Sequence, residues 1–155
     1  LHLIGHLQSN KAKKIVPLVD GIDSVDSVRL ASLISDTAAA LGRAMPILLE
    51  FNTSGEDAKS GFETESQLYD AIDAISKLPG VSIQGLMTIG PLNGNQADVE
   101  SAFTRLAELR TRCMSRYPST SFSTLSMGMS SDYALAVSAG STCVRLGTVL
   151  FGRRD

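Results

Sequence analysis

The sequence alternates short apolar runs with amphipathic stretches, and this alternation constrains the fold more than any other feature. The apolar runs predict strands at residues 1–5, 22–25, 47–51, 81–89, 122–127 and 142–146. Between them, apolar residues recur every three or four positions, which is typical of helices packed on a sheet. Strands that alternate with helices over short connections are parallel and joined by right-handed crossovers. The sequence therefore predicts an α/β fold.

The predicted helix after the second strand shows the pattern most clearly. Its apolar face consists of Val28, Ala31, Ile34, Ala38 and Leu41. Asp26 or Ser27 is placed to begin this helix, and Gly42 stands where a glycine ends one. By the same reasoning, we expect Ser9 or Asn10 to cap a short helix limited by Pro17. Ser131 or Asp132 is expected to cap a later helix that stops at Gly140, and a final short helix is predicted over residues 148–152.

Chain length discriminates between two folds that share this alternation, a doubly wound sheet and a (β/α) barrel. A complete (β/α)₈ barrel typically needs about 250 residues and seldom fewer than about 200. About six strand–helix units in 155 residues match three-quarters of a barrel, and the chain enters its first strand directly at Leu1. We therefore expect one domain over residues 1–155. It would be a TIM-type (β/α)₈ barrel without about its first two β/α units, leaving about six parallel strands.

Composition excludes several classes of protein. A formal charge of −2 does not suggest binding to nucleic acid or to a membrane surface, and the basic cluster Lys11, Lys13 and Lys14 is interpreted as a solvated helix face. No apolar run approaches the roughly 20 residues that span a bilayer. Cys113 and Cys143 lack metal-ligand spacing, so we expect no metal site and two small buried thiols in a reduced, cytoplasmic protein.

Two predicted strand ends near the C-terminus run into turns of small residues. Residues 126–132 read SMGMSSD, and residues 144–148 read VRLGT, with Phe151 and Gly152 close behind. Such turns leave backbone N–H groups free to converge on an anion, and glycine lets the backbone come close. From spacing alone, a phosphate site and a bare strand–helix turn both remain open.

Five segments occur in order at or near the predicted strand ends. They are residues 4–11 (IGHLQSNK), 52–56 with 59–62 (NTSGE, KSGF), 85–89 (GLMTI), 125–132 (LSMGMSSD) and 144–148 with 151–152 (VRLGT, FG). Together they resemble the pyridoxal phosphate homeostasis protein family, whose fold is like the alanine racemase N-terminal domain. The resemblance covers essentially the whole chain.

The resemblance implies a (β/α)₈ barrel that carries pyridoxal 5′-phosphate at the C-terminal ends of its strands. It implies a cytoplasmic carrier in vitamin B6 homeostasis with no established enzymatic reaction, so no catalytic residue is assigned. Intact members of the family are expected to be monomers, and apo enzymes that depend on this cofactor are candidate partners. No nucleic acid or membrane is expected to take part.

By the same resemblance, the cofactor-binding residues are Ser126, Arg145, Gly147 and Thr148. Ser126, Gly147 and Thr148 are expected to hold the phosphate with hydroxyl and turn N–H groups. Arg145 is expected to face the pyridine nitrogen. Because arginine donates only and keeps its proton, it disfavours protonation of that nitrogen and weakens the ring as an electron sink. The alternative for Arg145 is an ion pair with a carboxylate inside the barrel.

The lysine that forms the family's Schiff base with the cofactor is expected upstream of Leu1. The lysines considered for that role are Lys11, Lys13, Lys14, Lys59 and Lys77, and none of them lies in the family's lysine motif. We therefore assign the covalent role to no residue of this chain.

Several residues near the strand ends admit two interpretations. His6 is either a general base or, as we prefer, a histidine that holds the turn at residues 8–10. Asn52 and Thr53 either line the site or only shape a strand–helix turn. Met87, Met127 and Met129 are expected to pack around the mouth or the core.

Two functions compete with a cofactor carrier. The first is an amino-acid racemase of the alanine racemase fold. It would need a second acid/base, which racemases of this fold take from a separate C-terminal domain. The second is an assembly piece whose two open strand edges pair with another chain.

Overall fold

The computed structural model describes residues 1–56 and 59–152. These residues form the strands β1 (His2–Leu3), β2 (Gly21–Val25), β3 (Met45–Glu50), β4 (Val81–Met87), β5 (Thr124–Met129) and β6 (Cys143–Arg145). Neighbouring strands pair in parallel, and their order in the sheet follows their order in the chain. A doubly wound sheet would reverse its strand order at a switch point. The prediction of an α/β protein with about six parallel strands is therefore confirmed, and the doubly wound alternative is wrong.

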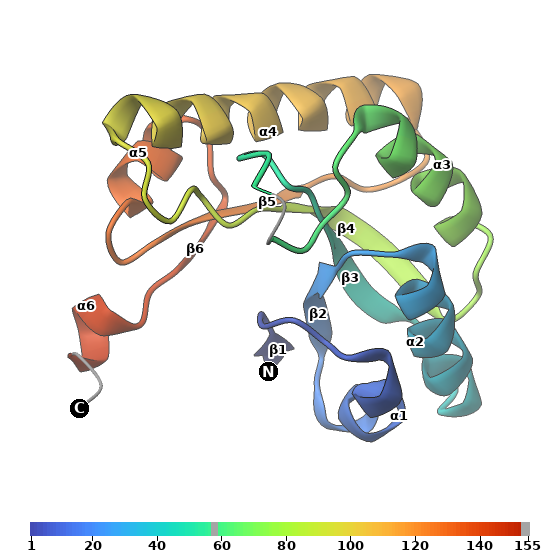
Figure 1. Ribbon diagram of the computed structural model, residues 1–155. Coiled ribbons are helices and arrows are strands. Elements are labelled where there is room, and N and C mark those ends of the chain that lie inside the picture. Colours follow the sequence, from blue (N-terminus) through green and yellow to red (C-terminus); the bar gives the residue numbers. More distant parts are fainter. Residues whose placement is uncertain (57–58, 153–155) are drawn as a thin grey trace.

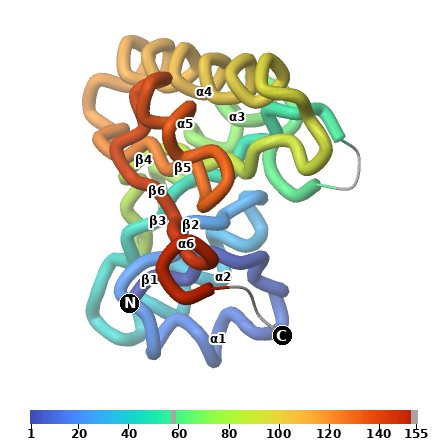
Figure 2. The backbone as a smooth tube through the Cα atoms, turned by 90° about the vertical axis from the view of Figure 1, so that its left-hand side faces the viewer, coloured from blue at the N-terminus to red at the C-terminus, as the bar shows by residue number. Residues whose placement is uncertain are grey.

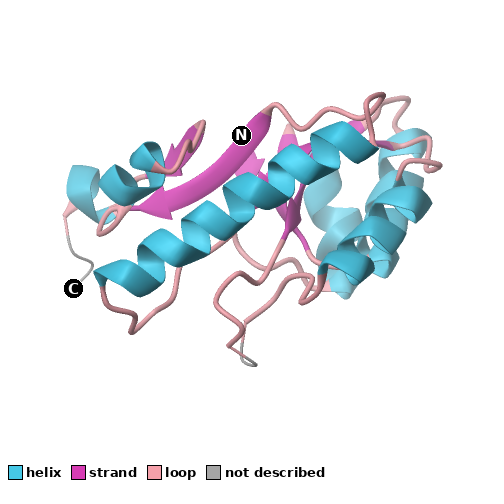
Figure 3. Cartoon of the chain, turned by 90° about the horizontal axis from the view of Figure 1, so that it is seen from above, coloured by secondary structure: helices cyan, strands magenta, loops and turns pink. Residues whose placement is uncertain are grey.

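Apart from the last short helix, the helices lie along the convex side of this curled sheet (Figure 1). They are α1 (Ala12–Ile15), α2 (Val28–Ala40), α3 (Glu65–Ile75), α4 (Gln96–Arg116), α5 (Tyr133–Ser138) and α6 (Thr148–Phe151), with 3₁₀ turns η1 (Ser9–Lys11) and η2 (Val16–Leu18). Seen from above, α4 runs across the sheet (Figure 3), and α6 stands apart from α4 in both Figure 1 and Figure 2. Over the described residues the sheet is open, with β1 and β6 at its two ends.

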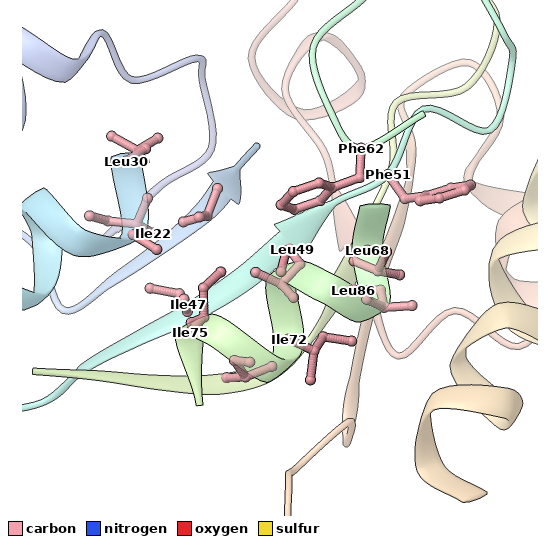
Figure 4. Packing of buried hydrophobic residues seen from close by; sticks show 14 of the residues in the cluster. Ile22, Leu30, Ile47, Leu49, Phe51, Phe62, Leu68, Ile72, Ile75 and Leu86 are labelled. Carbon is pink, nitrogen blue, oxygen red and sulfur yellow. The ribbon is translucent and has the colours of Figure 1, made fainter. Parts of the chain in front are cut away.

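The core fills the space between the sheet and the helices. Along β3, alternate residues Ile47 and Leu49 are buried in this core, as is Phe51 just beyond the strand. They lie near Leu68, Ile72 and Ile75 of α3 (Figure 4). Because side chains of a strand alternate between faces, Leu48 falls on the concave side, where it lines a cavity. The predicted burial of this run on both faces is confirmed, since Leu48 and Glu50 are also buried.

The helix starts confirm some of the predicted caps and correct others. Ser27 Oγ accepts from the N–H of Leu30 at 3.3 Å, as predicted for α2. No side chain caps α1, because the 3₁₀ turn η1 feeds directly into it, so the Ser9 or Asn10 cap is wrong. At α5 the Asp132 carboxylate instead accepts from the N–H of Met129, which precedes the helix.

Two details of burial also differ from expectation. Val28 and Leu41, at the two ends of the predicted apolar face, are 39% and 52% exposed, because each flanks the packed middle of α2. Cys113 is buried in the core, but Cys143 is only half-buried because β6 lies at the end of the sheet. The polar sequence of residues 52–57 also predicts a loop after β3, and its last residue, Asp57, lies outside the described residues.

Candidate functional site

The candidate site lies at the C-terminal end of β6, where the chain turns into α6. A cavity of about 970 Å³ opens there and is lined by Arg145, Gly147, Thr148 and Ser130, with His2 and Asp23 also on its wall. Three of the four predicted cofactor-binding residues therefore share one cavity. The fourth, Ser126, is fully buried beside it.

Gly128 sets the turn that carries Ser130. Its φ of +93° lies in the region that favours glycine, and a Cβ there would sit 2.5 Å from the Cβ of Ala136. The absence of a side chain thus lets α5 pack directly on β5. Asp132 Oδ1 accepts from the N–H of Met129 at 2.6 Å and holds the turn closed.

Ser130 connects this turn to the one after β6. Its Oγ accepts from the backbone N–H of Gly147 at 3.2 Å and from that of Val149 at 3.2 Å. Two backbone donors thus converge on one oxygen atom, and a bound phosphate oxygen requires the same arrangement. Gly147, Thr148 and Val149 are all exposed, so this turn lies at the surface of the cavity.

Arg145 reaches across three strands. From β6, its Nη1 donates to Ser126 Oγ of β5 at 2.7 Å, and its Nη2 donates to the Thr88 carbonyl oxygen, just beyond β4, at 2.8 Å. Thr88 is fixed in turn, because its hydroxyl donates to the Phe51 carbonyl at 2.8 Å and lies 3.0 Å from Thr53 Oγ1. The alternative of an ion pair is wrong, since Arg145 makes none with the described carboxylates.

Burial shapes the electrostatics around this arginine. It lowers the pKa of Arg145, while nearby Cys143, Asp23 and Glu50 act in the opposite direction. A guanidinium nevertheless stays protonated at neutral pH. Burial raises the pKa of Glu50, and a hydrogen bond from Ser60 Oγ to Glu50 Oε1 at 2.8 Å works against that rise. The site therefore combines a fixed cation with carboxyl groups further along the sheet.

The structure separates the interpretations left open for other strand-end residues. His6 Nδ1 lies 3.3 Å from Asp26 Oδ2, so within the described residues it pairs with a carboxylate and does not hold the turn at residues 8–10. Asn52 shapes its own loop, accepting from Gly55 N and donating to the Glu56 carbonyl. Met87 and Met127 are core residues, whereas Met129 lines the cavity.

The structure also shows the surroundings of four of the lysines that were considered for the Schiff base. Lys11, Lys13 and Lys14 are exposed, as expected of a solvated helix face. Lys59 Nζ donates to the Gly90 carbonyl at 2.8 Å and lies 3.1 Å from Glu56 Oε2. It thereby ties together the loops after β3 and β4.

Sequence reasoning missed two residues of the site. Ser130 was part of the SMGMSSD segment, but no sequence pattern says which of its serines meets the turn after β6. Thr88 was part of the GLMTI segment, and its role comes through its backbone carbonyl, which any residue carries. In the described ranges 1–56 and 59–152, no helix is long and apolar enough to cross a membrane.

The curled parallel sheet, with a donor-rich turn and an arginine at one end, belongs to an α/β protein of the alanine racemase N-terminal type. The family model described as "Alanine racemase, N-terminal domain" matches residues 2–155. The alanine racemase of Clostridium difficile 630 superposes with a TM-score of 0.78 over 99% of this chain and 42% of the racemase, at 14% identity. That likeness concerns the fold alone.

Relatives with higher sequence identity show to which family of this fold the chain belongs. The pyridoxal phosphate homeostasis protein of Vibrio cholerae is 40% identical over 154 residues, which are 99% of this chain and 64% of the relative. That of Synechocystis sp. is 40% identical over 153 residues, which are 99% of this chain and 69% of the relative. The chain belongs to the pyridoxal phosphate homeostasis protein family and spans about two-thirds of the length of these relatives.

A solved structure of PipY from Synechococcus elongatus PCC7942, with pyridoxal phosphate bound, matches with a TM-score of 0.89. It is 38% identical to this chain, and the match covers 97% of this chain and 69% of PipY. The structure of PipY without the cofactor matches with a TM-score of 0.92.

Proposed function

We propose that the chain binds pyridoxal 5′-phosphate at the end of β6 and acts in the homeostasis of this cofactor without catalysing a reaction. The observation that carries the proposal is the pair of N–H groups, from Gly147 and Val149, that converge on Ser130 Oγ in the cavity that Arg145 also lines. The names of the relatives and the cofactor bound to PipY support it.

The residues of the site fit the two polar ends of the cofactor. The hydroxyl groups of Ser130 and Thr148 would hold the phosphate, and a phosphate oxygen could take the place of Ser130 Oγ on the N–H of Gly147, since a dianion needs several converging donors. Arg145, which donates to Ser126, would face the ring nitrogen. When bound, pyridoxal phosphate supplies an aldehyde that reacts with amines and a ring that withdraws electrons.

Arg145 also explains why this site suits storage better than catalysis. A guanidinium offers only donors, so it can donate to an unprotonated ring nitrogen but has no acceptor for a protonated one. An unprotonated ring is a weaker electron sink, which disfavours chemistry on a bound amino acid. The alanine racemase of Clostridium difficile 630 is 14% identical, so its likeness supports the shared fold and not the racemase alternative.

The proposal extends to the whole family domain and its setting. We propose that residues 1–155 belong to a single cofactor-binding domain whose full-length relatives close the sheet into an eight-stranded barrel. We further propose a monomer in the cytoplasm that delivers the cofactor to apo enzymes. The free thiols Cys113 and Cys143 suit that reducing compartment.

Titration with pyridoxal phosphate, followed by its absorbance and fluorescence, tests the proposal. We expect saturable binding that inorganic phosphate competes away, and pyridoxal, which lacks the phosphate, should bind at least about tenfold more weakly. Ser130→Ala should weaken binding of the phosphorylated form by about tenfold or more, because a charge-assisted hydrogen bond is lost. Ser115→Ala, on the exposed face of α4, is the matched control. Equal affinity for pyridoxal and its phosphate would refute the assignment.

A further inference from the structure

We propose that Ser126 is a positioning residue that orients the Arg145 guanidinium and does not bind the phosphate. Ser126 acts through Arg145, so its effect on the cofactor rests on the function proposed above. Through Arg145, Ser126 would influence whether the ring nitrogen of the cofactor is protonated, and it would have little influence on cofactor affinity.

The position of Ser126 is the first argument. Its side chain is fully buried, and it is not among the residues that line the cavity, whereas Ser130, four positions later, is. The two serines are separated by Gly128 and its turn, so they lie at different depths. Ser126 pairs in register with Cys143, the first residue of β6, while Met129 pairs with Arg145, its last residue. A phosphate at the turn after β6 meets Ser130 first.

The second argument is the geometry of the guanidinium. A planar group is fixed by two contacts at different atoms, and Ser126 Oγ and the Thr88 carbonyl bind Nη1 and Nη2 respectively. These contacts come from β5, which neighbours β6, and from the residue just beyond β4, on the far side of β5 (Figure 1). Arginine has five N–H donors in a rigid fork, so two bonds leave donors for a ligand in the cavity.

The chemical identity of the two anchors is the third argument. Both are neutral oxygen atoms, and Arg145 forms no ion pair within the described residues. A carboxylate at position 126 would hold the guanidinium equally well but would cancel its charge. A serine hydroxyl accepts the hydrogen bond and leaves the charge intact, which is what a group that must keep a ring nitrogen unprotonated requires.

The experiment compares Ser126→Ala with Ser126→Cys, Ser126→Thr, Ser130→Ala and the control Ser115→Ala. Cysteine keeps nearly the size of serine but accepts hydrogen bonds weakly, whereas threonine keeps the hydroxyl. One readout needs no cofactor: the rate at which phenylglyoxal modifies Arg145, followed by mass spectrometry. Loss of the Ser126 bond should raise that rate by about tenfold, because the guanidinium is then free on one side.

The second readout is the pH dependence of the absorbance of bound pyridoxal phosphate. In Ser126→Ala and Ser126→Cys, the ring nitrogen should take up a proton at higher pH than in the unaltered protein, and Ser126→Thr should restore the original profile. Affinity for pyridoxal phosphate should stay within about threefold in these variants, because no bond to the phosphate is lost. Ser130→Ala should show the reverse, with weaker binding and an unchanged rate of Arg145 modification.

The possible results distinguish a failure of this inference from a failure of the function on which it rests. A loss of affinity in Ser126→Cys equal to that in Ser130→Ala, with Arg145 modified at the original rate, overturns the inference and makes Ser126 a phosphate ligand. If Ser126→Ala does not fold, the rate of Arg145 modification and the cofactor affinity of Ser126→Cys decide whether Ser126 positions Arg145. If the unaltered protein binds no pyridoxal phosphate, the proposed function fails, and the phenylglyoxal arm still decides whether Ser126 holds Arg145.

Discussion

Replacing Gly128 with alanine should destabilise the protein through the contact that positions the site. Gly128 has a φ of +93°, and an added Cβ would lie 2.5 Å from the Cβ of Ala136 and 3.1 Å from the Cα of Tyr133. A side chain at positive φ costs about 1–2 kcal/mol. Forcing a methyl group into a closed contact costs about 1–3 kcal/mol more. The sum is about 3 kcal/mol, of which roughly half comes from packing.

Gly140 supplies a matched control for this substitution. Its φ is +94°, nearly the same as that of Gly128, but nothing lies within 4 Å of an added Cβ. Gly140→Ala should therefore cost only the backbone part, about 1.5 kcal/mol. The difference between the two variants isolates the packing of α5 on β5.

Thermal unfolding followed by circular dichroism measures both losses. For a chain of this size, 1 kcal/mol lowers the melting temperature by about 2–4 °C. Gly128→Ala should thus melt about 6–12 °C lower than the unaltered protein, and Gly140→Ala about 3–6 °C lower. If Gly128→Ala costs no more than Gly140→Ala, then α5 does not pack on β5 as described, and the placement of Ser130 loses its support.

Three further predictions concern other parts of the molecule. Burial raises the pKa of Glu50, so the folded state keeps this proton to a higher pH than the unfolded chain, and stability falls as pH rises through that window. Glu50→Gln should therefore stabilise the protein at pH 8 and not at pH 4 in denaturant titrations, and an equal effect at both would contradict the shift. Burial raises the pKa of the Cys113 thiol to about 12, so at pH 8 iodoacetamide should label the half-buried Cys143 and spare Cys113 until urea is added. Phe103→Ala, at a fully buried position, should cost about 3–5 kcal/mol in chemical denaturation. Phe151→Ala, at a position 86% exposed, should cost almost nothing, and similar losses would contradict the described core.

The alternation of strands and helices was readable in the sequence because it depends on local periodicity. The run at residues 47–51 is buried on both faces, and Ser27 caps α2 as its position suggested. Strand order was not readable to the same degree, because alternation alone fits both a doubly wound and a singly wound sheet. The consecutive pairing from β1 to β6 settles that choice through contacts between strands.

The sequence predicted which residues lie in the candidate site, but it did not predict the hydrogen bonds between them. Arg145, Gly147 and Thr148 line one cavity as their motif suggested. Which serine meets the turn after β6 depends on the positive φ of Gly128 and on hydrogen bonds that span 17 and 19 residues. Local pattern carries no information on either. The same reason explains His6, whose partner Asp26 lies on the neighbouring strand–helix unit.

The central claim is that the turn formed by Ser130, Gly147 and Thr148 holds the phosphate of pyridoxal 5′-phosphate. Phosphorus NMR of the cofactor observes that group directly, and the second ionisation of a phosphate monoester, near pH 6, shifts its resonance. The account predicts that adding the protein moves and broadens this resonance and makes it insensitive to pH. Excess inorganic phosphate or the substitution Ser130→Ala should reverse the change. A cofactor spectrum that stays the same with and without the protein, across that pH range, would contradict the claim.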